Sequence, residues 1–431
     1  MNTRACYDLI VVGGGIAGYH TAFSARDADP GMKILVISAE TTPTYSAPSL
    51  PDYVSGHIPR EKVFVAREED FEARRIELRL NQRVTSADPE AKTLTTEKGE
   101  VLAYRRLVLA TGSVPIRLRR MPGTSLPGNH VLRTVADAEA LASAPAKRAV
   151  VVGTGAIGLE GASALRERGV EEVTLVEALE WINPKCFDRR ASDYMTAELE
   201  RIGVRVLLGE GIVSVEGNDR VSGVRTAKRA IPCDLVLWGI GMRPVVDLAV
   251  SMGAALGEHG GIRIDAQMRT SLPDVYAVGD CTEPYDLFYR KNMPNMLWRT
   301  ATEQGMLLGS LLGGGQAEDY EGAKLLFLTY VGDAPACACG YPESALKGQR
   351  YTVLEDCGPG GYRKVLLQRR RIVGFQMVNT LEGANELYAQ MLKGEPVELA
   401  AGLERDPVRF PLKSVALSAY LARMERVRPA E

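Results

Sequence analysis

The sequence lacks the features that would mark a membrane protein or a nucleic-acid-binding protein. No apolar run reaches the roughly 18 residues that a membrane-spanning helix needs. The first expected strand starts within the first ten residues, which leaves no room for a signal peptide. The formal net charge is only −2, so the charge balance does not point to nucleic acid or anionic lipid. We therefore expect a cytoplasmic protein that neither inserts into membranes nor binds nucleic acid.

Cysteine is also scarce. Seven cysteines are scattered along 431 residues, and none of them forms a Cys-x-x-Cys motif. Their odd number and wide spacing argue against a disulfide framework and against a cysteine-rich zinc or iron–sulfur site, so we expect no metal. With 45% hydrophobic and 25% charged residues, the chain has the composition of an ordinary globular protein. Its length allows about two to four domains.

A glycine-rich turn follows the first apolar segment. Residues 9–12 read as a short strand buried on both faces, and Gly13, Gly15 and Gly18 then give the pattern G-x-G-x-x-G. The first glycine permits the tight turn, the second lets the backbone approach a pyrophosphate, and the third lets the following helix pack against the strand. The N-terminal N–H groups of that helix would face the phosphates.

The same pattern occurs a second time, and this repeat is the strongest organisational signal in the chain. Residues 149–152 form an expected strand, and Gly153, Gly155 and Gly158 supply the second G-x-G-x-x-G. A helix is expected to follow as far as Arg168. Two complete fingerprints in one chain predict two bound dinucleotides.

Each fingerprint is followed by an acidic residue at the end of the next expected strand. Glu40 lies 40 − 18 = 22 residues after Gly18, and Glu177 lies 177 − 158 = 19 residues after Gly158. A carboxylate at this point can accept hydrogen bonds from a ribose. Glu177 would repel a 2′-phosphate, and no arginine follows it immediately. The second site is therefore interpreted as specific for NAD(H) rather than NADP(H).

The segments between these motifs have weaker patterns. Residues 41–56 are expected to form a loop leading into a short helix, and residues 62–80 to be mostly helical. Short strands near residues 83–86, 93–96 and 101–104 suggest a hairpin-like excursion. Three further segments are expected to be buried strands that close on small-residue turns: residues 107–112, 233–241 and 270–280. The last of them ends at Asp280, whose carboxylate could bind a ribitol hydroxyl or cap a helix.

In this order, the segments VVGGGIAG, LVLATGSVP, VVGTGAIGLE, GIGMRP and RTSLPDVYAVGDC resemble the FAD-dependent pyridine nucleotide-disulfide oxidoreductase superfamily. The resemblance is greatest to its rubredoxin-reductase-like and nitrite-reductase-flavin-domain-like branch. It spans about residues 7–310, with a weaker match at 361–387. It implies an α/β fold with two Rossmann-like dinucleotide-binding domains, arranged as in glutathione reductase, and an α+β C-terminal interface domain. The implied domains are a discontinuous FAD domain at 1–115 and 245–318, an NAD domain at 116–244 and the interface domain at 319–431.

The resemblance also implies roles for individual residues. Glu160 corresponds to the acid that such enzymes place beside the nicotinamide, where it would orient the carboxamide. Glu303 and Gln304 would begin a helix aimed at the flavin pyrimidine, where a helix N-terminus stabilises the anion that develops on reduction. The other implied FAD-binding residues are Gly13, Gly14, Gly15, Ile16, Ala17, Gly18, Glu40, Val84 at the adenine, Ala110, Thr111, Gly112 and Asp280. Those implied for NAD(H) are Gly153, Gly155, Ile157, Gly158 and Glu177, and Gly241 is a further implied cofactor-binding residue.

The chain departs from these relatives in one loop. Disulfide reductases of the superfamily carry Cys-x-x-x-x-Cys just after the second strand, but residues 41–56 contain no cysteine. A flavin without an adjacent thiol cannot feed a disulfide relay, so electrons would leave from the flavin itself. Asp52 also stands where ferredoxin reductases carry a lysine near the flavin. Asp52 would either lower the flavin potential or contact the nicotinamide.

Two features of the C-terminal region leave alternatives open. Cys337 and Cys339 are two residues apart and share one face of an expected strand, with Cys357 further on. They are interpreted as inert packing, with a redox dithiol or a metal site as the alternative. Arg369 to Arg371 lie in or beside an expected hairpin turn, which would be simply solvated or would form a docking patch for an acidic electron carrier.

The sequence thus predicts an FAD enzyme that exchanges hydride with NAD(H) and electrons with a redox protein. That protein would be rubredoxin, ferredoxin or an iron–sulfur subunit, and either direction of transfer is compatible with the sequence. The chain could act alone, as an oligomer, or as the NAD-reactive subunit of a larger dehydrogenase complex. The alternatives are a flavoprotein with a structural, binding or redox-sensing role, and a reductase that uses the C-terminal dithiol.

Overall fold

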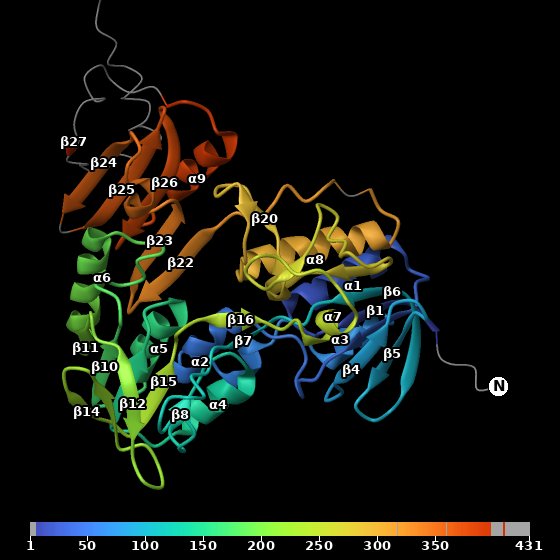
Figure 1. Ribbon diagram of the computed structural model, residues 1–431, viewed down its shortest axis with the longest axis horizontal. Helices are drawn as coiled ribbons and strands as arrows, with labels where there is room; N and C mark the ends of the chain where they lie inside the picture. The colour runs from blue at the N-terminus through green and yellow to red at the C-terminus, as the bar shows by residue number, and fades with distance from the viewer. Residues whose placement is uncertain (1–5, 317, 359, 398–407, 410–431) are drawn as a thin grey trace, which may run out of the picture.

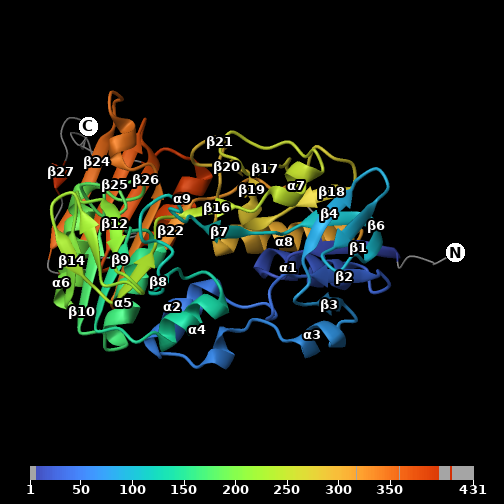
Figure 2. The same ribbon diagram turned by 60° about the horizontal axis from the view of Figure 1, so that its bottom comes forward.

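A computed structural model describes residues 6–316, 318–358, 360–397 and 408–409. The molecule consists of three lobes, which Figure 1 shows apart, and Figure 2 shows the first lobe apart from the other two. The N-terminal strands and α8 form the lobe at the right of Figure 1, and the second glycine motif lies in the lower left lobe. The last strands of the chain form the upper left lobe. No helix among the described residues is long and apolar enough to cross a membrane.

The first lobe is built on a seven-stranded sheet with the order β3-β2-β1-β6-β5-β4, and β18 pairs with β6. β1 (Cys6–Val12) lies parallel to β2 (Ile34–Ile37) and to β6 (Val101–Leu109). All four residues of β2 are buried, as expected of a strand covered on both faces. The remaining strands are β3 (Glu77–Arg79), β4 (Val84–Asp88), β5 (Thr93–Thr96) and β18 (Val275–Ala277).

Two helices of this lobe pack unusually closely. α1 (Ile16–Ala28) follows the first glycine motif, and α8 (Trp298–Leu312) runs alongside it (Figure 2). A Cβ atom at Gly305 would lie 2.5 Å from the carbonyl oxygen of Ala17, and one at Gly309 would lie 2.4 Å from that of Thr21. Glycine is therefore required along this face of α8, and the contact fixes α8 against the helix that begins at the glycine motif.

The second lobe repeats the parallel architecture, with the strand order β11-β10-β9-β15-β8. Its central strands form a continuous apolar core with the helix that follows the second glycine motif. The strands are β8 (Asn129–His130), β9 (Arg148–Val152), β10 (Glu172–Val176), β11 (Val204–Leu207) and β15 (Leu235–Trp238), with an added antiparallel sheet of β12 (Ile212–Glu216), β13 (Gly223–Thr226) and β14 (Ala230–Pro232). The helices are α4 (Val135–Ser143), α5 (Ala156–Glu167) and α6 (Arg189–Arg201).

The two crossings between these lobes run side by side. β7 (Ser113–Pro115) leaves the first lobe, β16 (Met242–Pro244) returns to it, and the two pair as an antiparallel ribbon. The ribbon lies between the lobes in Figure 1. Both parallel sheets are thus joined at one place.

The third lobe is a sheet with the order β22-β23-β26-β25-β24-β27 and one helix, α9 (Ala384–Lys393). Its first strand, β22, forms one edge of the sheet and lies beside α5 of the second lobe. The strands are β22 (Leu326–Val331), β23 (Ala334–Gly340), β24 (Thr352–Gly358), β25 (Gly361–Gln368), β26 (Arg371–Val378) and β27 (Val408–Arg409). The expected α/β fold with an α+β C-terminal part is confirmed.

Two expectations about local structure were wrong. Residues 62–80 are not mostly helical, because β3 (Glu77–Arg79) pairs with the edge of β2 and only α3 (Glu68–Ala73) is an α-helix there. The strands expected near 101–104 and at 107–112 are one strand, β6, because its residues 101–103 pair with β5 and its residues 103–109 pair with β1. The smaller elements are η1 (Ala47–Ser49), α2 (Leu50–Ser55), η2 (Arg60–Val63), α7 (Asp247–Ser251), β17 (Ile262–Arg263), η3 (Gly279–Cys281), β19 (Thr282–Glu283), β20 (Tyr285–Asp286), β21 (Lys291–Asn292) and η4 (Glu343–Leu346).

Candidate functional site

The first glycine motif forms a turn between β1 and α1 that is closed on one side and open on the other. Gly13 has φ +119°, and a Cβ there would lie 2.0 Å from the carbonyl oxygen of Ala110. A Cβ at Gly18 would lie 2.0 Å from the carbonyl oxygen of Gly13. At Gly15, which caps α1, a Cβ would meet no atom within 4 Å. The turn therefore presents bare backbone and a helix N-terminus, which is the geometry that binds a phosphate.

The second glycine motif, between β9 and α5, has the same geometry. Gly153 has φ +97°, and a Cβ at Gly158 would lie 1.9 Å from the carbonyl oxygen of Gly153. The nearest atom to a Cβ at Gly155 is 3.9 Å away. Gly155 caps α5 with nearly the same backbone angles that Gly15 has at α1. The structure thus contains two equivalent open turns, one on each parallel sheet.

The two acidic residues lie at the ends of the strands beside these turns. Glu40 is exposed and accepts a hydrogen bond from the Tyr45 hydroxyl at 2.9 Å. Glu177 follows β10, and its Oε2 accepts hydrogen bonds from the backbone N–H of Thr154 at 3.0 Å and from its hydroxyl at 2.5 Å. Its Oε1 accepts one from the N–H of Leu179. Glu177 therefore also holds the second glycine turn, a structural role that the sequence did not indicate.

At the carboxyl edge of the first sheet, a polar cluster gathers around Asp280. Its Oδ2 accepts a hydrogen bond from the Ser113 hydroxyl at 2.7 Å and lies 3.5 Å from a guanidinium nitrogen of Arg133. The same nitrogen lies 3.7 Å from the position of a Cβ at Gly112. Sequence analysis missed Arg133, because it belongs to the second lobe and follows β8 with no motif around it. Only the folded structure brings its positive charge to the edge that would hold the FAD pyrophosphate.

The expected helix start at Glu303 and Gln304 was wrong. α8 begins at Trp298, so these two residues lie in its second turn. Glu303 forms an ion pair with Arg299 at 2.7 Å, one turn earlier in the helix. Gln304 is fully buried and accepts the N–H of Gly279 at 2.7 Å, while its Nε2 is a buried donor without a partner among the described residues. The resemblance implied a helix start at these two residues, but Glu303 lies inside α8 and its charge is neutralised by Arg299.

The remaining expected cofactor residues lie around the same edges. Gly14 packs against Ser38, and Ile16 and Ala17 form the first turn of α1. The Ala110 N–H donates to Val12. The hydroxyl of Thr111 donates to the carbonyl oxygen of Val245. Val84 starts β4, Ile157 lies in the first turn of α5, and Gly241 lies just before β16.

The structure brings together the two residues expected near the nicotinamide. Glu160 lies in α5, where its Oε1 accepts a hydrogen bond from the Thr329 hydroxyl at 2.8 Å. Burial raises the pKa of the Glu160 carboxyl to about 7, the nearby Asp52 carboxylate raises it too, and hydrogen bonds from Thr329 and the Tyr330 backbone lower it. Asp52 lies on α2, which packs against α5. A cluster of two acids therefore borders the second glycine turn.

The cysteines of the third lobe lie in its apolar core. Cys337 and Cys339 are both buried on β23 and pack with Phe375 and Met377. Burial raises the pKa of the Cys337 thiol to about 12 and that of Cys339 well above its usual value. Both are therefore protonated near neutral pH, which favours packing over redox chemistry. Among the described residues, no group of three or more His, Cys, Asp or Glu side chains could hold a metal ion.

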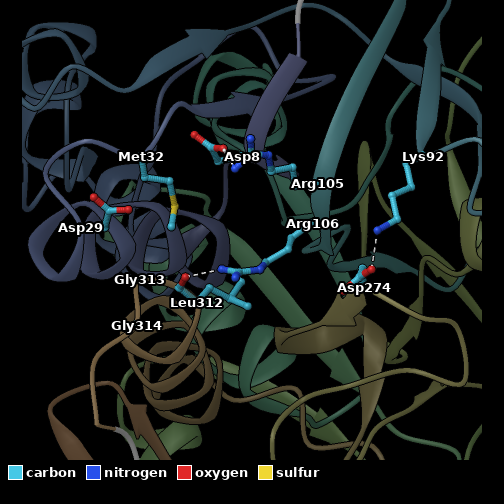
Figure 3. A pocket seen from close by; sticks show the side chains of 10 residues that line it. All are labelled: Asp8, Asp29, Met32, Lys92, Arg105, Arg106, Asp274, Leu312, Gly313 and Gly314. Atoms are coloured by element: carbon cyan, nitrogen blue, oxygen red, sulfur yellow. Dashed lines mark hydrogen bonds and ion pairs between the residues drawn. The ribbon is translucent and has the colours of Figure 1, made fainter.

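A surface pocket lies at the opposite edge of the first sheet (Figure 3). It is lined by residues from the beginning of strands and from the last turns of α1 and α8, among them Asp8, Asp29 and Leu312. Lys92 pairs with Asp274 at 2.5 Å, and Figure 3 shows this pair at one side of the pocket. Cofactors of such sheets bind outside the carboxyl ends of the strands, so this pocket is not the cofactor site.

The sequence matches the pyridine nucleotide-disulphide oxidoreductase family over residues 7–305. It is 28% identical over 389 residues to a nitrite reductase (NAD(P)H) of Bacillus subtilis, covering 89% of this chain and 47% of that protein. It is 36% identical over 281 residues to the 5,5′-dehydrodivanillate O-demethylase ferredoxin reductase subunit of a Sphingobium species, covering 64% and 67%. The chain thus spans about half the length of the nitrite reductase.

Among solved structures, a covalent putidaredoxin reductase–putidaredoxin complex has a TM-score of 0.85 to this chain at 26% identity. The match covers 98% of this chain and 100% of that one. The relatives include NADH oxidases and NAD-linked reductases, which agrees with the two open glycine turns on separate sheets. The chain therefore belongs to the pyridine nucleotide-disulphide oxidoreductase family.

Proposed function

We propose that the protein transfers hydride from NADH to FAD and passes the electrons from the flavin directly to a one-electron carrier protein. The observation that carries this proposal is the combination of two open glycine turns with a thiol-free loop between them. Residues 41–56, which lead into α2 beside α5, contain no cysteine. The buried thiols Cys337 and Cys339 are packed in the core of the third lobe. No thiol relay is therefore needed to explain the site.

The residues at the first sheet suit FAD. Bare backbone at Gly15 leaves room for a pyrophosphate, Arg133 adds a positive charge, and Asp280 adds a carboxylate at the same edge. The buried Nε2 of Gln304 is a donor that a polar ligand edge could satisfy. When bound, FAD supplies a centre that accepts a hydride and releases single electrons. We assign the FAD diphosphate to Gly13–Gly18 and the adenosine ribose to Glu40, with Val84, Ala110, Thr111, Gly112 and Glu303 as further neighbours.

The residues at the second sheet suit NAD(H). The turn at Gly155 would hold the pyrophosphate, and Glu177 would accept the ribose 2′-hydroxyl with lone pairs that remain beside its bonds to Thr154. Glu160 would orient the carboxamide, and Asp52 would lie next to it. We also propose domain boundaries after residues 115, 244 and 318. The first two coincide with the ends of the paired strands β7 and β16, where the chain passes between the first and second lobes. The cytoplasmic location belongs to the same proposal.

The relatives support a protein acceptor. One is a ferredoxin reductase subunit, another is a rubredoxin–NAD⁺ reductase, and a solved structure shows putidaredoxin reductase bound to putidaredoxin. We therefore propose ferredoxin, rubredoxin or an iron–sulfur subunit as partner. The nitrite reductase match favours a second form, in which the chain is the NAD-reactive part of a larger assembly, because that relative is about twice as long as the matched region. Transfer towards NAD⁺ would use the same site.

The decisive experiment separates hydride transfer from electron exit. Acid-released flavin should amount to about one FAD per chain, and anaerobic NADH should bleach it in a single fast phase. Mixing the reduced protein with ferredoxin or rubredoxin should then restore the flavin absorbance. A preparation that reacts with NADH but contains no flavin contradicts the proposal. Slow turnover with every acceptor and a long-lived NADH–flavin charge-transfer band would favour a sensing role instead.

A further inference from the structure

The edge strand of the third lobe supplies hydrogen-bond donors to α5 of the second lobe. Leu328 and Tyr330 of β22 are each 49% exposed, whereas Thr329 between them is 1% exposed because it points towards α5. The Thr329 hydroxyl donates to Glu160 at 2.8 Å, and the N–H of Tyr330 also donates to this carboxyl. Three residues further along both elements, the N–H of Gly332 donates to the Ser163 hydroxyl at 3.0 Å.

A buried polar cluster elsewhere in the same interface keeps the third lobe in place. The side-chain amide of Gln376 accepts the N–H of Asp188 at 2.9 Å and donates to its Oδ2 at 2.8 Å. Lys364 lies 3.0 Å from the same carboxylate and also pairs with Glu343. Asp188, Lys364 and Gln376 are all nearly inaccessible to solvent. The donors of β22 are therefore held in a fixed position relative to Glu160.

We propose that Thr329 is a positioning residue for the nicotinamide site, through which the C-terminal lobe controls whether Glu160 is charged and hence which oxidation state of the nicotinamide binds more tightly. This inference rests on the proposed function, in which Glu160 lies beside the nicotinamide. A donor from Thr329 stabilises the carboxylate rather than the carboxylic acid. The nicotinamide ring of NAD⁺ carries a positive charge and that of NADH does not, so an ionised Glu160 favours NAD⁺.

The charged and polar groups around Glu160 make its carboxyl change charge within an experimentally accessible pH range. Burial and Asp52 both disfavour the carboxylate, and the two donors of β22 oppose them, so the pKa of Glu160 is about 7. The other titratable groups nearby are Glu167 on α5, His57 just after α2, and Asp333 in the turn after β22. Binding of NAD⁺ near neutral pH should release the Glu160 proton to solvent. NAD⁺ affinity should therefore rise with pH until Glu160 is fully ionised in the free protein.

The test measures binding rather than turnover, using the oxidised protein with its FAD. Dissociation constants for NAD⁺ and NADH are determined by calorimetry from about pH 5.5 to about pH 9 for the natural chain, Thr329→Val, Thr329→Ser and Glu160→Gln. Thr329→Val keeps the shape but removes the donor, so the midpoint of the NAD⁺ affinity curve should move up by about one pH unit. Thr329→Ser, the matched control, should keep the natural midpoint. Glu160→Gln should remove this pH dependence.

An infrared measurement gives a second readout that does not depend on nucleotide. In the difference spectrum between the natural chain and Glu160→Gln, the carbonyl band of the protonated Glu160 carboxyl should appear, and in Thr329→Val this band should persist to higher pH. The same midpoint in Thr329→Val and the natural chain would overturn the inference. A pH dependence that survives Glu160→Gln would also overturn it, because a group other than Glu160 would then carry the pH dependence. If the FAD-loaded natural chain binds neither nucleotide at any pH, the proposed function itself fails. This result differs from failure of the Thr329 inference alone, in which both nucleotides still bind.

Discussion

Gly15 and Gly18 lie three residues apart in the first turn, yet a methyl group would meet different surroundings at each. A Cβ at Gly18 would collide with the carbonyl oxygen of Gly13, whereas one at Gly15 would extend into open space. Gly18→Ala should therefore destabilise the fold, whereas Gly15→Ala should change the free energy of unfolding of the flavin-free protein by only about 1 kcal/mol, the usual effect of alanine at a helix N-cap. FAD binding should nevertheless weaken sharply in Gly15→Ala. Thermal unfolding with and without added FAD measures both effects.

Gly155→Ala is the matched control on the second sheet. The nearest atom to its Cβ would be 3.9 Å away, so this substitution should be as harmless to folding as Gly15→Ala. It should leave the FAD content at about one per chain and weaken NADH binding alone. If Gly155→Ala loses FAD while Gly15→Ala retains it, the assignment of the two dinucleotides is reversed.

Glu177 combines a structural and a selective role, and a substitution must separate them. Its carboxylate accepts two hydrogen bonds from Thr154, and the amide oxygen of Glu177→Gln can still accept them. The natural chain should prefer NADH over NADPH by at least about tenfold in kcat/KM, because a carboxylate facing a phosphate costs more than about 1.4 kcal/mol. Glu177→Gln should narrow that ratio by about tenfold. The unfolding temperature should fall slightly, because the amide keeps the bonds from Thr154 but cannot also accept the N–H of Leu179. Adding Ala178→Arg should favour NADPH further.

If Glu177→Gln keeps the natural ratio of kcat/KM for NADH over NADPH, then Glu177 only stabilises the second glycine turn. Glu177→Ala is informative as a harsher variant, since it removes both roles. If Glu177→Ala lowers stability while the ratio stays constant, the selectivity for NADH must come from another residue.

At the scale of elements, periodic and locally encoded features were predictable. The strands flanking each glycine motif, the end of α5 at its C-cap residue Arg168 and the turn at Arg369 and Arg370 follow from apolar runs and turn residues. Features decided by partners distant in the sequence were not predictable. β3 is a strand because β2 offers a free edge, and α8 begins at Trp298 rather than at Glu303, where the resemblance to the family placed its start.

The residues of the candidate site divide in the same way, into those that carry a signal in the sequence and those that do not. The glycines and the acids at strand ends carry sequence signals, because their spacing is fixed by one strand–helix unit. Arg133 and Thr329 carry none, since each reaches the site from another lobe. Asp52 was singled out only by comparison with relatives, and its proximity to Glu160 depends on the packing of α2 against α5.

The contact between α1 and α8 should be sensitive to single methyl groups. Gly309→Ala places a Cβ 2.4 Å from the backbone of Thr21, so α8 must shift away from α1. We expect a loss of about 1 to 3 kcal/mol in unfolding free energy, the usual effect of overpacking. Because α1 begins at the first glycine turn, Gly309→Ala should also bind FAD more weakly. Met306→Ala on the same helix, at a position 49% exposed, should change stability by less than about 0.5 kcal/mol.

At the scale of the whole molecule, the third lobe has two contrasting connections to redox chemistry. Its buried interface reaches Glu160 through β22, whereas its outer turn exposes Arg369 at the tip of the β25–β26 hairpin. Arg370 in that turn is partly tied down, because its Nε donates to the carbonyl oxygen of Val397 at 3.1 Å. The first connection would act on the nicotinamide and the second on an acidic partner.

Neutralising Arg369 and Arg371 to glutamine should therefore weaken reduction of an acidic carrier protein in a salt-dependent way. Raising the ionic strength should reduce the difference between this variant and the natural chain, since charge steering is screened beyond about 8 to 10 Å. Reduction of ferricyanide should not change, because a small dye needs no docking surface. Equal loss with the protein carrier and with the dye would point to damage of the fold instead.

The route by which electrons leave decides between a direct flavin enzyme and a thiol relay. Cys337 and Cys339 are buried on β23 and protonated near neutral pH, and Cys357 is exposed on β24, which β26 and β25 separate from β23. Alanine suits the two buried positions because it adds no polar atom to an apolar core, and serine suits Cys357. The triple variant Cys337→Ala, Cys339→Ala, Cys357→Ser should bleach its flavin with NADH at the natural rate and then reduce ferredoxin or rubredoxin nearly unchanged. Loss of carrier reduction with normal flavin bleaching would show that electrons pass through a C-terminal dithiol, since the variant would then block only the step after the flavin.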